Sequence, residues 1–114
     1  MQTLQTDELF HILERMVSLH RTLIGVLAEE YSHMTSIDVI GLRETAQAKE
    51  VLVNEIWNLE QMRIKISEGM AKNLNTDHTL ESIASALPQN ASERLRVSRT
   101  ALQILMDRAK ESNQ

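Results

Sequence analysis

Apolar residues recur every three or four positions along two long stretches of the chain, residues 6–34 and about 38–72. This spacing is typical of an amphipathic α-helix, because a half-buried strand would alternate at every second residue. The second stripe averages 3.5 residues per repeat, like the seam of a coiled coil. The pattern predicts two long helices. The first stripe is Leu9, Leu13, Met16, His20, Leu23, Leu27, Glu30 and Met34, and the second is Leu42, Thr45, Lys49, Leu52, Ile56, Leu59, Arg63, Ile66 and Met70.

Only residues 35–38 separate the two long stripes, so the helices are expected to run antiparallel. Thr6 is expected to cap the first helix, and Thr35 with Asp38 is expected to form a capping box that opens the second. The second helix, of about 36 residues, should span about 54 Å. We expect Leu52 and Ile56 to be buried in the seam of this hairpin.

The rest of the chain predicts two shorter helices. A polar linker at residues 73–77 is followed by a helix over residues 79–87, which Pro88 ends. Asn90 with Glu93 has the spacing of a capping box for a last helix that runs to about residue 110. The predicted fold class is all-α. One helical domain is expected over residues 1–114, with a long hairpin at 1–73 followed by a short and a longer helix at 74–114.

Composition agrees with helix packing and excludes several classes of site. Only 3% of the residues are aromatic, so the core must be built of aliphatic side chains and Met. The chain has no Cys, which excludes disulfides, thiolate metal sites and Cys nucleophiles. The net charge of −4 and a single short basic run, at Arg94, Arg96 and Arg99, argue against nucleic-acid binding.

Nothing in the sequence indicates targeting to a membrane. The first residues do not combine a basic segment with an apolar run, as a secretory signal would. No stretch approaches 18 uncharged apolar residues, so no membrane insertion is expected. We expect a cytoplasmic protein.

Two Glu-x-x-His motifs, at Glu8–His11 and Glu30–His33, are the only candidates for metal ligands. Both lie on the first predicted helix, about 33 Å apart, so they cannot share a metal within one chain. We expect solvated polar positions, with no metal, no cofactor and no catalytic residues, because no nucleophile elbow or phosphate loop frames any Ser, His or Asp.

Apolar residues outside the main seam indicate either further packing or a partner. The second long helix carries an additional stripe of Val53, Trp57 and Ile64. The last helix carries two adjacent stripes, of Leu95, Leu102 and Leu105 and of Val97, Ala101 and Ile104. Either these two helices bury the stripes against each other, or the stripes form a surface for a partner's amphipathic helix.

The two long helices combine, in this order, a turn containing Asp, a seam Lys and a Leu-Glu-x-x-Arg ending. The residues of this pattern, within roughly residues 9–70, are Leu19, Leu23, Leu27, Glu29, Glu30, Asp38, Leu42, Lys49, Leu52, Ile56, Leu59, Glu60 and Arg63. In this pattern the chain resembles the FlgN-type flagellar export chaperones.

The resemblance implies a bacterial cytoplasmic chaperone for hook-associated proteins, those of the hook–filament junction. Such a chaperone holds a disordered terminal segment of its client and delivers it to the flagellar type III export apparatus. In the family the client is bound toward the C-terminal helix. The positions available here are Leu95, Val97, Ala101, Leu102, Ile104 and Leu105. The alternative is a structural or adaptor coiled coil that forms a homodimer through the same stripes and has no client.

Overall fold

The computed structural model describes residues 2–112, of which 91% are helical. The four helices are α1 (Gln2–Thr35), α2 (Val39–Leu74), α3 (Leu80–Ala86) and α4 (Gln89–Ser112). No strand occurs in the described residues, which confirms the all-α prediction. The long hairpin is also confirmed: α1 and α2 run antiparallel, and the molecule measures 54 × 20 × 18 Å.

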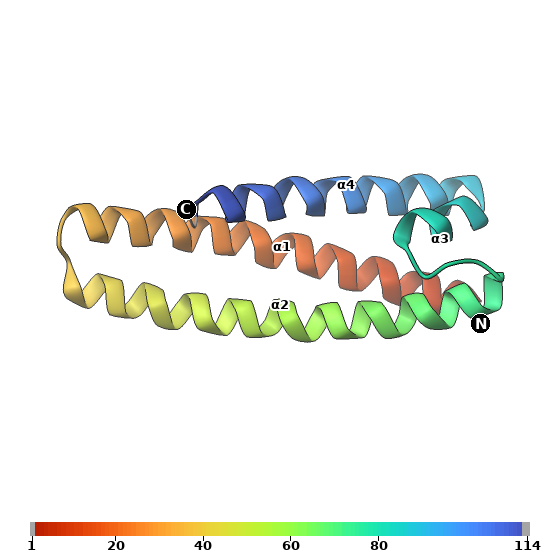
Figure 1. The fold of residues 1–114 in the computed structure, drawn as a ribbon, viewed down its shortest axis with the longest axis horizontal. Coiled ribbons are helices and arrows are strands. Elements are labelled where there is room, and N and C mark those ends of the chain that lie inside the picture. The colour runs from red at the N-terminus through yellow and green to blue at the C-terminus, as the bar shows by residue number, and fades with distance from the viewer. Residues whose placement is uncertain (1, 113–114) are drawn as a thin grey trace.

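Helix α4 lies on α1 rather than on α2. It runs parallel to α1 and covers part of its length, while α3 sits beside the N-terminal part of α4 (Figure 1). Within residues 2–112, no Cα atom of α4 comes within 8 Å of one in α2. Of the two alternatives for the extra apolar stripes, burial of the second and last helices against each other is therefore wrong, because both helices pack on α1 instead.

The core is centred on α1. Its fully buried Leu9 and Leu13 meet Ile83 of α3 and Leu95 of α4 in one cluster, to which α2 contributes the fully buried Met70. In the middle of α2, Leu52 and Ile56 are only half-buried, contrary to the expectation for a sealed seam. One neighbouring helix covers this part of α2, whereas α1 is covered from two sides.

The helix ends differ in detail from the sequence-based expectations. Thr6 is a buried residue inside α1, and Thr35 is the last residue of α1. Asp38 alone caps α2, where its Oδ1 accepts a hydrogen bond from the Gly41 N–H at 3.0 Å. Asn90 lies within α4, which begins directly after Pro88. A capping residue chosen by type and spacing alone is ambiguous where several polar residues precede a helix.

The turn between α1 and α2 ends α1 in an unusual way. The Asp38 N–H donates to the His33 carbonyl at 2.8 Å and the Ile37 N–H to that of Met34 at 3.3 Å. These are the two hydrogen bonds of a Schellman motif, whose left-handed position normally holds Gly or Asn. Here it holds Ile37, with φ 54° and 83% exposure. At the end of α2 the left-handed residue is Asn75.

Truncating the core of α1 should cost far more than truncating the middle of α2. Leu13→Ala removes a fully buried side chain and should lower the free energy of unfolding by about 2–5 kcal/mol. Ile56→Ala should cost about 1–2 kcal/mol, because water already reaches part of that side chain. Urea denaturation measures both. Equal losses would contradict a core centred on α1.

Replacing the left-handed Ile37 should stabilise the protein. Ile37→Asn relieves a backbone conformation that costs an ordinary residue about 1–2 kcal/mol, and it removes little buried surface. We expect a gain of about 1 kcal/mol in the free energy of unfolding. Ile40→Asn, an exposed control within α2, should give no gain. An equal gain at both positions would show that replacing an exposed apolar side chain, and not relief of backbone strain, is the cause.

Candidate functional site

The two apolar stripes of α4 differ in burial. Leu95, Leu102 and Leu105 are buried in the core cluster around α1, so in this conformation they hold α4 in place and are not accessible to a partner. Val97 and Ile104 point outward, with 69% and 50% of their surfaces exposed. Of the six residues predicted to bind a client, the structure leaves an exposed stripe of Val97 and Ile104, with the half-buried Ala101 between them.

This outer stripe of α4, Val97, Ala101 and Ile104, lines an open hollow of about 390 Å³ together with Arg96 and Thr100. All five residues belong to one helix, so the hollow is a shallow surface and not a cleft between elements. Its lining has one charged group, and no group in it is placed for catalysis. It is suited to contact with another apolar surface.

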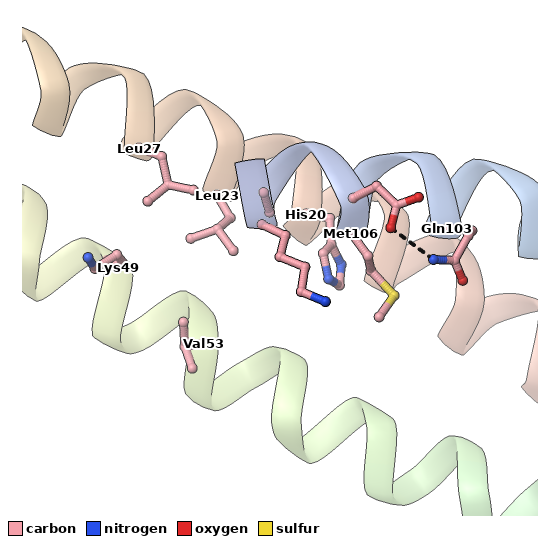
Figure 2. Close-up of a pocket in the computed structure, with 10 residues that line it drawn as sticks. His20, Leu23, Leu27, Lys49, Val53, Gln103 and Met106 are labelled. Carbon is pink, nitrogen blue, oxygen red and sulfur yellow. Dashed lines mark hydrogen bonds between the residues drawn. The ribbon is translucent and has the colours of Figure 1, made fainter. Parts of the chain in front are cut away.

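A deeper feature lies between α2 and α4, which α1 holds apart. Two hollows of about 350 Å³ each occupy this gap. Gln103 and Met106 line both of them, so the hollows adjoin and form one groove. In Figure 2, His20 of α1 and Met106 of α4 reach toward α2, which contributes Lys49 and Val53 from the opposite side.

The floor of the α2–α4 groove is formed by α1. Leu23 and Leu27 are buried there, beside the buried His20. The His20 Nδ1 lies 2.8 Å from the Met16 carbonyl oxygen. A carbonyl can only accept a hydrogen bond, so Nδ1 carries a proton and the ring is fixed to its own helix. His20 is thus part of the floor of the groove and is held to its own helix.

The charged seam residues of α2 are paired. Lys49 Nζ lies 3.0 Å from Glu30 Oε2 across the hairpin, and Arg63 Nε donates to Glu60 Oε1 at 3.0 Å within α2. Lys49 and Arg63 both line the groove.

The two Glu-x-x-His motifs are not brought together. Glu30 pairs with Lys49, while His33 Nδ1 lies 3.2 Å from Asp38 Oδ2 at the turn. Glu8 and His11 are exposed near the other end of α1. In residues 2–112 no three His, Cys, Asp or Glu side chains are grouped as a metal site would require.

The basic run on α4 is engaged within the chain. Arg94 pairs with Glu14 at 2.7 Å and lies 4.3 Å above the ring centre of Phe10, which ties α4 to α1. Arg96 and Arg99 share Glu81 of α3, at 3.0 and 3.7 Å. The hydrogen bond from Arg96, followed by its charge, lowers the pKa of Glu81.

Sequence reasoning missed two groups of surface residues. On α4, Gln103, Met106 and Lys110 recur at spacings of three and four residues and line the groove. The sequence pattern did not point to them, because the two neighbouring stripes are more apolar. The turn end of the hairpin is also apolar and exposed, and it includes Met34, which the sequence pattern placed in the stripe of the first helix. The residues there are Tyr31, Met34, Ile37, Val39 and Ile40.

Fold and surface together define a helical protein that offers apolar surfaces for contact. No helix within residues 2–112 combines the length and hydropathy needed to cross a membrane. The sequence profile of the family described as FlgN protein matches residues 1–114, and the chain belongs to the FlgN family. FlgN is a family of flagellar export chaperones and not of enzymes. No curated protein and no solved structure matches the chain.

Acid should loosen α3 from α4. Because the pKa of Glu81 is lowered in the folded protein, the ion pairs of its carboxylate stabilise the folded state fully at pH values above the ordinary pKa range of a glutamate. It is lost as the pH falls through the lowered pKa of the folded state. NMR titration of the Glu81 carboxyl should show this pKa, and Glu81→Gln should remove the effect on the amides of α3. An ordinary pKa in the intact protein would contradict the shared ion pair.

Proposed function

We propose that this protein is a cytoplasmic chaperone that binds hook-associated flagellar proteins and delivers them to the type III export apparatus. Membership of the FlgN family along the whole chain supports the general role. The single observation that carries the client-binding part is the outer stripe of α4. Its apolar side chains remain exposed although α4 is firmly packed on α1.

The outer stripe of α4 has the properties that capture of a disordered client segment requires. Such a segment can fold into an amphipathic helix on contact, and burial of apolar area contributes about 25 cal/mol per Å² against the cost of ordering. Val97 and Ile104 are seven residues apart and thus lie on one face of α4, with Ala101 allowing close approach between them.

The buried stripe has a supporting role in this proposal. Leu95, Leu102 and Leu105 fix α4 against α1, so the outer stripe is presented on a rigid helix. Polar substitutions at Leu102 and Leu105 would loosen α4 itself and would not isolate client binding. The Arg94, Arg96 and Arg99 side chains also serve mainly to hold α4, because each has an acidic partner in the chain.

The outer stripe can be tested without disturbing the core. The double variant Val97→Ser with Ile104→Ser removes two exposed side chains and should keep its helicity. We expect its affinity for a purified hook-associated protein, measured by calorimetry, to fall at least about ten-fold, which corresponds to roughly 1.4 kcal/mol.

A matched control is Val51→Ser with Met62→Ser, two exposed apolar residues of α2 outside the outer stripe, which should leave affinity unchanged. Equal losses in both variants would contradict a site on the outer stripe. If the intact chain binds no hook-associated protein at micromolar concentration and instead forms a homodimer, the adaptor function replaces the chaperone function.

A further inference from the structure

We propose that two copies of this chain pair through α2, antiparallel to each other and about a two-fold axis that passes close to Ala46. The contact is made by an exposed stripe of α2, which the proposed client site on α4 does not use. The residues of this exposed α2 stripe are Val39, Arg43, Ala46, Glu50, Val53 and Trp57.

The exposed α2 stripe is one continuous face of the helix. Its members follow each other at spacings of four and three residues, which keeps them on one side of α2. All six are exposed, and Val39 and Trp57 have 64% and 62% of their surfaces free. The described part of α4 stops well short of the turn between α1 and α2 (Figure 1). The end of the hairpin, within residues 2–112, is therefore a pair of helices with an uncovered apolar face.

The order of residue types in the stripe is nearly the same in both directions from Ala46. Val39 and Val53 are each seven residues from Ala46, while Arg43 and Glu50 are three and four residues from it. In an antiparallel pair, Val39 of one copy would face Val53 of the other, and Arg43 would face Glu50. A two-fold axis forms each of these contacts twice. The small side chain of Ala46, at the axis, allows the two helices to approach closely.

The charges of the stripe select a second copy in this orientation. Neither Arg43 nor Glu50 has an ion pair within residues 2–112, whereas the adjacent Lys49 is already paired with α1. Gln47 and Asn54, which follow Arg43 and Glu50 by four residues each, are uncharged. The stripe thus holds one free cation and one free anion. Antiparallel pairing joins opposite charges at both positions, while parallel pairing would bring like charges together.

The same pairing accounts for the exposure of Trp57 and Ile37. Trp57 is eleven residues beyond Ala46, so it would lie beside the turn of the other copy, at residues 36–38. Ile37 is in that turn, 83% exposed and with φ 54°, a conformation that Gly or Asn adopts at lower cost. An apolar side chain held in a strained backbone conformation is explained if Trp57 of the other copy covers it.

The proposed dimer has a definite shape. The two copies would overlap from the turn to Trp57, which is about 30 Å of α2. Since each copy is 54 Å long, the dimer would be an elongated particle of about 80 Å. Contact through one stripe of a single helix is at the small end of specific interfaces, so association is expected at micromolar concentration. Small-angle X-ray scattering measures the length, and a dimer no longer than one copy would contradict this overlap.

Charge reversal tests the pairing directly. Arg43→Glu and Glu50→Arg each put like charges opposite one another twice, and each should weaken self-association at least about ten-fold in sedimentation equilibrium. An equimolar mixture of the two variants restores opposite charges at both positions, so it should form a heterodimer about as tight as the original dimer. Glu44→Arg, an exposed control outside the stripe, should leave self-association unchanged. A monomeric intact protein, or a mixture that does not associate, would overturn the proposal.

The only Trp of the chain reports the register of the pair. Emission from Trp57 should shift to shorter wavelength as the protein concentration rises through the association range. Ile37→Asn should raise the free energy of unfolding of the dilute monomer, by relief of strain, and yet weaken the dimer several-fold. These two effects have opposite signs. If Ile37→Asn changes neither association nor Trp57 emission, the copies do not meet in this register and the proposal fails.

This inference and the proposed function can fail separately. The double variant Val97→Ser with Ile104→Ser should self-associate like the intact chain, because its changes lie on α4. If that variant is monomeric while the charge-reversed variants still dimerise, the copies pair through α4 and the proposal is overturned. If the charge mixture recovers the dimer but no hook-associated protein binds the chain, the α2 pairing stands and the client is the part that fails.

Discussion

The structure depends on the burial of two neighbouring faces of a single helix, α1. One face meets α2 across the hairpin and the other meets α4, and half of the residues in the core cluster, among them the fully buried Leu9 and Leu13, belong to α1. Helices α2 and α4 are therefore held in register with each other only through α1 and the short α3. Because α1 packs closely against both α2 and α4, its side chains leave little room for either helix to move toward the other.

This arrangement explains why so much apolar surface stays accessible in a well-packed protein. Much of the surface of each outer helix is not covered by a neighbouring helix, so residues such as Val53 on α2 and Val97 on α4 stay exposed. Rigid helices present these residues, so binding of a flexible segment as proposed would cost the chaperone little conformational entropy. The ordering cost then falls mainly on the client, which suits reversible capture and release.

The sequence predicts the long hairpin well because helical periodicity is a local property, repeated over some thirty residues in each arm. It predicts helix ends poorly, as at Thr35 and Asn90, since several polar residues near each boundary have capping chemistry. The pattern of apolar residues does not predict which side chains of α4 are exposed at the candidate site. Leu102 and Ile104 are equally apolar in the sequence, and only docking of α4 on α1 decides that Leu102 is covered and Ile104 exposed.

The ion pair between Glu14 and Arg94 joins residues that are 80 positions apart, and it has a consequence for how the chain is made. During synthesis α1 emerges first, but its second face, which includes Phe10 and Val17, meets α4 only after residues 89–112 have been translated. Until then a growing hairpin carries an uncovered apolar strip. Folding is thus less local than an all-helical composition suggests, and its completion is linked to the arrival of the last helix.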